Sequence, residues 1–244
     1  MKTRVRAYHT ISLNRSISHL LPAFGFMLVP LLALVALSYV TGIAFPKIIE
    51  ALVISSSRLF IAFIISVIIA WFLVIWLIRG RTANPALAMF DVLQSMPTFA
   101  ILPLAVHFLG AHESIIIIFL ILTIIWPIIF SIVSALKQAE RSWEEAIIMT
   151  RLNGLSYIRY YLLPLTAPGI VTGSIIGLGE GWEALIATEL LLNVERGLGP
   201  FFNQFSTNAS ITFFGVLVFL IIIFTINKFI WLPLLEKSHE LIEE

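Results

Sequence analysis

The hydrophobic positions of this chain form six long runs that are separated by short polar stretches. Each run has about the 20 residues that a helix needs to cross the hydrocarbon core of a bilayer. Even the isoleucine-rich fourth run is predicted to be helical, because in lipid a helix satisfies its own backbone hydrogen bonds. The sequence therefore predicts an all-α polytopic membrane protein with about six transmembrane helices, at 21–45, 59–78, 85–109, 115–136, 168–192 and 211–230.

Composition supports the same class. Hydrophobic residues make up 59% of the 244 positions and charged residues only 12%, where a soluble domain carries about 25%. The mean hydropathy is +1.02. The net charge of +1 argues against nucleic-acid binding, and the absence of cysteine excludes disulfides, thiolate metal sites and thiol nucleophiles.

The distribution of lysine and arginine predicts the orientation. With a cytoplasmic N-terminus, twelve of these residues lie on the cytoplasmic side, and three (Lys47, Arg58 and Arg196) lie outside. This asymmetry satisfies the positive-inside rule, so both termini are expected in the cytoplasm. The predicted segments are a basic, interfacial 1–20, an uncleaved first span with its outer loop at 21–58, a core at 59–230 and a cytoplasmic tail at 231–244.

A polar interruption at 143–168 separates the fourth and fifth predicted spans, and it would lie in the cytoplasm. Glu144 and Glu145 begin a helical pattern, and Gly154 can supply the positive backbone angle that ends it. Ser156 is expected to cap a second short helix, which Pro164 would end. The sequence predicts either a projecting knuckle of two short helices or an ordinary surface loop.

The segment EAIIMTRLNGLSYIRYYLLP resembles the EAA loop of permease subunits from binding-protein-dependent ABC importers. Glu145, Ala146, Leu163 and Pro164 fit that pattern without a gap. The segments 90–110, 163–182 and 187–202 are also similar to the family, and together the resemblance covers about 60–230. The branch that transports nitrate, taurine and sulfonates is the most similar.

This resemblance implies a type I importer permease with no cofactor and no ATPase activity of its own, and the chain lacks the GxxxxGK[ST] phosphate loop. The implied partners are two ATPase subunits, an extracytoplasmic substrate-binding protein, a second permease copy that is expected to be identical, and membrane lipid. The cargo would be a small solute such as a sulfonate, taurine, nitrate or a vitamin precursor.

The resemblance also implies which residues contact the ATPase. One departure is Arg151, at a position where the family usually has glycine, so that either the loop turns later, at Gly154, or Arg151 contacts the ATPase directly. The predicted ATPase-coupling residues are Glu145, Ala146, Met149, Arg151, Asn153, Gly154, Leu155, Leu163 and Pro164.

Acidic residues in the fifth span are the most distinctive polar feature. Glu180 and Glu183 are three residues apart on one helical face. Charges inside a bilayer usually face a bundle interior or a wet cavity, so the pair either lines the substrate pathway or braces neighbouring helices. If the pair lines the pathway, a simple anion such as nitrate is disfavoured. Asp91 and Gln94 are further candidates for the pathway or for a dimer contact.

Three further polar or turn-forming features lie near the predicted outer ends of the spans. Glu189 matches a family position and is expected to be structural. Gly197, Leu198 and Gly199 are expected to form an outer turn, which is either a plain turn or a contact for the binding protein. His107, His112 and Glu113 lie close in sequence, but further ligands are missing, so no metal site is predicted.

Two other classes of function stay open on the residues alone. A secondary transporter or channel would work without an ATPase and often contains inverted repeats, which are not visible here. A membrane-embedded protease is less consistent, because the chain has no HExxH or GxSxG motif.

Overall fold

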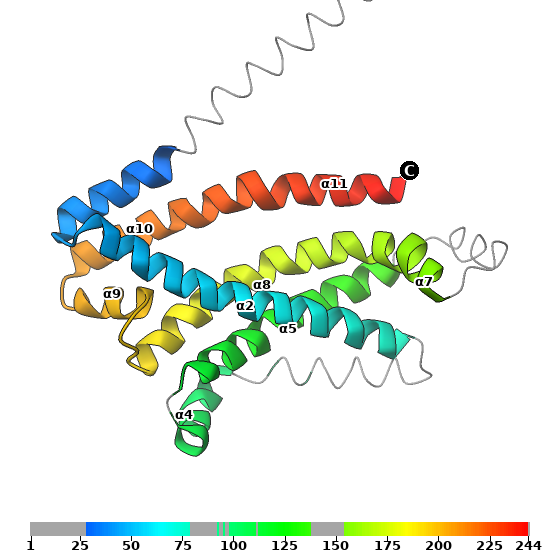
Figure 1. The fold of residues 1–244 in the computed structure, drawn as a ribbon, viewed down its shortest axis with the longest axis horizontal. Helices are drawn as coiled ribbons and strands as arrows, with labels where there is room; N and C mark the ends of the chain where they lie inside the picture. Colours follow the sequence, from blue (N-terminus) through cyan, green and yellow to red (C-terminus); the bar gives the residue numbers. More distant parts are fainter. Residues whose placement is uncertain are drawn as a thin grey trace, which may run out of the picture. The chain divides into compact units, whose positions relative to one another are not determined.

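Figure 1 shows the fold as a computed structural model, in which residues 28–78, 92, 95, 98–110, 112–137 and 154–243 are described. Over these ranges the regular structure is helical throughout. The helices are Leu28–Thr41, α2 (Phe45–Ile78), α4 (Thr98–Leu109), α5 (Glu113–Lys137), α7 (Gly154–Tyr157), η1 (Ile158–Leu162), α8 (Leu163–Leu191), α9 (Leu198–Gln204), α10 (Ala209–Ile226), η2 (Asn227–Trp231) and α11 (Leu232–Glu243).

Four helical stretches in the described part are long and apolar enough to cross a membrane. They are Phe45–Trp76, Glu113–Lys137, Gly154–Leu191 and Ala209–Ser238. These four contain most or all of the second, fourth, fifth and sixth predicted spans. The first and third predicted spans are described only in part, as the shorter helices Leu28–Thr41 and Thr98–Phe108.

The second span begins earlier than the hydrophobic pattern predicts. Residues 46–58 were expected to form an outer loop, but they are helical, because α2 starts at Phe45. Polar residues such as Ser55 and Arg58 break the apolar run in the sequence. In the fold both side chains are buried and have hydrogen-bond partners on other elements, so they are compatible with a helix inside the protein.

The fifth span also departs from the expectation, because Pro164 does not end a helix and the span does not begin at Pro168. Instead, Gly154–Leu191 is one continuous helical stretch of 38 residues, and Ser156 lies inside its first turn rather than capping it. A π-turn at Ile158–Leu162 precedes Pro164, and the Leu163 N–H donates to the Ile158 carbonyl. Proline has no N–H to donate, and it is tolerated where the regular i→i−4 pattern is already interrupted.

The described residues within 50–204 and 230–243 belong to a larger compact unit. Those within 28–49 and 205–229 belong to a smaller one. In the larger unit α5 and α8 pack along their length (Figure 1). The face of α5 toward this contact is a stripe of fully buried residues at helical spacing: Ile116, Leu120, Ile124, Ile128 and Ile132.

A stripe of small residues on α8 explains how closely the two helices approach. Gly169, Gly173, Gly177 and Gly181 recur every fourth residue and are all buried. A Cβ atom on Gly173 would lie 2.5 Å from the Cα of Ile128, and one on Gly169 would lie 2.7 Å from the Ser131 carbonyl oxygen. Since apolar burial does not drive helix association in lipid, such close backbone packing is a main source of stability between spans.

In the smaller unit, Asn208 caps α10, because its side-chain oxygen accepts a hydrogen bond from the Ile211 N–H. Most of α10 is apolar and at least partly exposed in the isolated chain, and among its residues only Gly215 and Val218 are buried. Such a surface is the expected one for a helix that faces lipid or another subunit.

Candidate functional site

A buried carboxylate organises the end of α8. Glu189 has no solvent exposure. Arg58 Nη1 donates to Glu189 Oε1 at 2.7 Å, and the Ser55 hydroxyl, 2.8 and 2.9 Å from the two carboxylate oxygens, donates to the same group. Since a buried charge is costly unless it is paired and hydrogen-bonded, these two residues of α2 make the position of Glu189 possible.

The turn after α8 folds back onto this carboxylate. The Gly199 N–H donates to Glu189 Oε2 at 2.8 Å, and the Leu198 N–H donates to Ser55 Oγ at 2.8 Å. A Cβ on Gly197, whose φ is +133°, would lie 2.6 Å from Glu189 Oε2, and one on Gly199 would lie 2.5 Å from the Cβ of Glu189. The close approach of this turn to Glu189 therefore requires both glycines of the Gly-Leu-Gly sequence.

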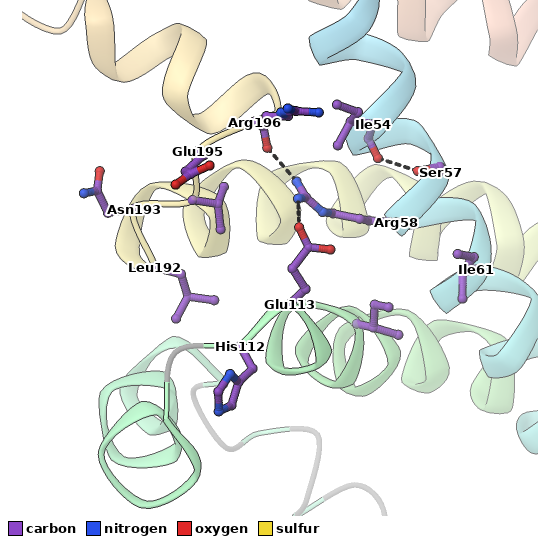
Figure 2. A pocket seen from close by; sticks show the side chains of 12 residues that line it. Ile54, Ser57, Arg58, Ile61, His112, Glu113, Leu192, Asn193, Glu195 and Arg196 are labelled. Atoms are coloured by element: carbon purple, nitrogen blue, oxygen red, sulfur yellow. Dashed lines mark hydrogen bonds and ion pairs between the residues drawn. The ribbon is translucent and has the colours of Figure 1, made fainter.

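Arg58 extends the network to a third helix. Its Nη2 donates to Glu113 Oε1 at 2.5 Å, at the start of α5, and its Nη1 also donates to the Arg196 carbonyl oxygen at 2.9 Å. Figure 2 shows the guanidinium between Glu113 and the turn, in the wall of a hollow of about 660 Å³. One side chain thus joins α2, α5, α8 and the turn that follows α8.

The predicted structural role of Glu189 agrees with this network, whereas its partners were missed by the sequence analysis. Arg58 was counted as an outer-loop charge. The partners could have been anticipated from the position of Glu189 within an apolar span, because a carboxylate there requires a cation or several hydrogen-bond donors nearby.

A second cavity lies along the middle of α5 and α8. It has a volume of about 530 Å³, and its wall includes Thr98, Thr123, Trp126 and Glu180. Thr123 and Trp126 lie about 15 Å and 20 Å from the start of the 25-residue α5, so the cavity is near the middle of that span. Glu180, about 16 Å from the end of α8, lies at a similar depth.

The two glutamates that the sequence analysis grouped differ in their surroundings. Both are exposed in the isolated chain. Glu180 contributes to the wall of the cavity, and Glu183 is not among the residues that line it. In the described part of the chain neither carboxylate has an ion-pair partner, and both alternatives for the pair, lining the pathway or bracing neighbouring helices, stay predictions. Asp91 and Gln94 lie outside the described residues.

The predicted coupling segment is described only at its C-terminal end. Glu145, Ala146, Met149, Arg151 and Asn153 lie outside the described residues, whereas Gly154, Leu155, Leu163 and Pro164 lie within them. Gly154 has a positive φ of +56°, as expected for a turn at this position. Leu155 is 78% exposed, whereas Tyr161, Leu162 and Leu165, further along the same helical stretch, form a small core.

The histidines form no metal site in the described part of the chain, where no three potential ligand side chains gather. His107 contacts the ring of Phe108, and His112 lies in the wall of the larger hollow.

Comparisons with known proteins identify the family. The family described as "Binding-protein-dependent transport system inner membrane component" matches residues 62–236, more than half of the chain. The nitrate import permease protein NrtB of Synechocystis sp. is 32% identical over 103 residues, 42% of this chain and 38% of that protein. The taurine transport system permease protein TauC of Escherichia coli is 32% identical over 109 residues, 45% and 39% of the two chains.

A bicarbonate transport system permease protein, CmpB of Synechococcus elongatus, is 26% identical over 113 residues, which is 46% of this chain and 41% of that protein. Each of these three alignments therefore spans less than two thirds of the relative's own length. The family match covers the whole of the cavity, the Glu189 network from α5 onward and all of the predicted coupling segment. This chain is accordingly a multi-pass membrane protein that belongs to the family of binding-protein-dependent transport system inner membrane components.

Proposed function

We propose that this chain is the permease subunit of an ATP-driven importer, which receives a small solute from a substrate-binding protein and passes it across the membrane. The observation that carries the proposal is the family match over residues 62–236. The named permeases for nitrate, taurine and bicarbonate support it. Permease subunits of ABC transporters are non-catalytic, and separate ATPase subunits hydrolyse the ATP.

The segment 145–164 is the proposed contact with the ATPase. Its C-terminal part is continuous with α8, since Gly154–Leu191 is one helical stretch without a break. Glu180 lies about 39 Å along this helix from Gly154. A displacement of the segment by the ATPase would therefore move the cavity wall as part of a rigid body, which is a common way to switch between two states.

The cavity beside Glu180 is the proposed part of the substrate pathway within one subunit. An exposed carboxylate at the middle of a span is very costly against lipid, so it faces either water or another subunit. We propose that a second copy of the chain completes the pathway on this side. Of the other predicted pathway residues, Glu183, Asp91 and Gln94 stay predictions.

The turn at 193–199 is the proposed contact for the binding protein. With cytoplasmic termini, as the distribution of lysine and arginine predicts, this end of α8 lies outside the cell. The Glu189 network fixes the backbone of the turn, and Glu195 and Arg196 remain exposed on it. A rigid turn with exposed charges is suited to specific contact with a soluble protein.

Co-purification tests the proposal and separates it from a secondary transporter or channel. The permease is co-expressed with a candidate ABC ATPase subunit from the same genome and purified in mild detergent through a tag on the permease. We expect a stoichiometric complex, which Glu145→Arg disrupts. Glu236→Arg, the same charge reversal at an exposed site on α11, is the matched control and should leave the complex intact. A permease that purifies without any ATPase would contradict the proposal.

A further inference from the structure

The wall of the mid-span cavity has a chemistry that indicates a class of cargo. On α8 it presents one carboxylate, that of Glu180. On α4 and α5 the hydroxyl residues of the wall are Thr98, Thr123 and Ser131, and Ser95 also lines the cavity. None of the described residues in this wall is a lysine, an arginine or a histidine. The only formal charge in the described wall is therefore negative.

The one charged group in the described part of this wall is a hydrogen-bond acceptor. A carboxylate accepts hydrogen bonds and donates none. Thr123 already uses its hydroxyl hydrogen on the Phe119 carbonyl oxygen, at 3.0 Å, so that its oxygen faces other groups as an acceptor. A solute that brings donors and positive charge would satisfy this wall, whereas an anion would meet the Glu180 carboxylate with no cation among the described lining residues to offset it.

Two aromatic residues of α5, Trp126 and Phe130, also line the cavity. They are four residues apart, so they follow one another on the same face of the helix. Aromatic faces attract cations, most strongly in the case of tryptophan, and they also pack against flat apolar groups. The volume of about 530 Å³ is within the range of small-molecule sites.

From this combination we infer that the cavity takes a small organic cation, an amine or ammonium group with a compact apolar or aromatic part, and that it disfavours anions. This inference rests on the proposed permease function and specifies the cargo of the same pathway. Glu180 is the specificity-determining residue, and Trp126 provides the aromatic surface for the cargo. The chain would then differ in cargo class from the relatives named for nitrate and bicarbonate.

Ligand-observed saturation-transfer NMR on the purified permease complex in phosphatidylcholine nanodiscs tests the inference. Two flat probes of similar size and opposite charge are titrated, N-methylpyridinium and benzenesulfonate, with empty nanodiscs as the blank. We expect saturable binding of N-methylpyridinium and at least tenfold weaker binding of benzenesulfonate. Tighter binding of benzenesulfonate, or no saturable binding of the cation, would overturn the inference.

Three variants identify the site. Glu180→Gln keeps the shape of the side chain and removes its charge, and it should weaken binding of N-methylpyridinium about tenfold, the effect of one charge-assisted hydrogen bond. Glu180→Asp retains the charge and should recover most of the affinity. Glu236→Gln removes the same charge at an exposed site on α11, outside the cavity wall, and should change the affinity less than threefold. An equal effect of the Glu180 and Glu236 variants would overturn the assignment to the cavity.

The outcome is separable from the proposed function. Complex formation with the ATPase depends on residues 145–164 and uses no cargo. A permease that binds its ATPase but prefers benzenesulfonate would refute the cargo class alone, whereas a permease without an ATPase would refute the transport proposal.

Discussion

Arg58 and Glu189 form an ion pair inside the protein, although 131 residues separate them in the sequence. Their Nη1 and Oε1 atoms are 2.7 Å apart, and the two side chains are 7% and 0% exposed. Arg58 also pairs with Glu113, whose side chain is 72% exposed. The same guanidinium therefore has one buried and one solvent-accessible carboxylate partner.

Removing the two partners should have unequal effects on stability. Glu189→Gln leaves the buried guanidinium without its buried counter-charge, and breaking such a pair costs about 3–5 kcal/mol. Glu113→Gln removes an exposed partner and should cost about 0–1 kcal/mol. Thermal unfolding in detergent, followed by tryptophan fluorescence, measures both. Equal shifts in unfolding temperature for the two variants would contradict the conclusion that the buried Arg58–Glu189 pair contributes more stability than the Arg58–Glu113 pair.

The glycine stripe on α8 predicts a second contrast. Gly173→Ala places a methyl group 2.5 Å from the Ile128 Cα, so α5 and α8 must separate, and we expect a loss of about 1–3 kcal/mol from this overpacking. Gly179→Ala, six residues further along the same helix, meets open space. This control should be neutral or slightly stabilising, because alanine has the higher helix propensity. The same unfolding assay compares them, and a Gly173→Ala variant as stable as Gly179→Ala would show that the helices are not packed this closely.

The turn beyond α8 provides a test of the crowding around Gly197, with Gly42 as a comparison glycine that has a positive φ and open space around it. Gly42 and Gly197 both have positive φ, at +69° and +133°. A Cβ on Gly42 meets nothing within 4 Å, whereas one on Gly197 overlaps Glu189 and Arg58. Gly42→Ala should therefore cost about 1–2 kcal/mol from conformation alone. Gly197→Ala should cost more and should also weaken any contact that the binding protein makes with the turn, measured by surface plasmon resonance.

Much of the fold follows from hydrophobic periodicity, and the errors occur where distant residues compensate a local signal. Run length alone predicts the helices at 115–136 and 211–230. Run length places the start of the second span too late, because Arg58 interrupts the apolar run. Arg58 can be buried within a helix only because Glu189, on α8, pairs with it. The presence of Pro164 predicts the end of a helix there. The helix continues because a π-turn precedes the proline, and no local sequence rule predicts that turn.

The candidate site could be predicted only in part for the same reason. The position of Glu180 and Glu183 on one face follows from their spacing. That Glu180 alone lines the cavity depends on where Thr98, Thr123 and Trp126 lie, and these come from other helices. The Gly-Leu-Gly turn was recognised as a turn, but its reason, the approach to Glu189, is a tertiary contact.

Site-directed photo-crosslinking tests the central claim, that the ATPase contacts residues 145–164, most directly. The natural chain has no cysteine, so Leu155→Cys and Glu195→Cys each provide a single site for benzophenone maleimide, at opposite ends of the continuous helical stretch Gly154–Leu191. On irradiation of the purified complex, the account predicts a crosslink from position 155 to the ATPase subunit and none from position 195. A crosslink to the ATPase from position 195, or from neither position, would contradict it.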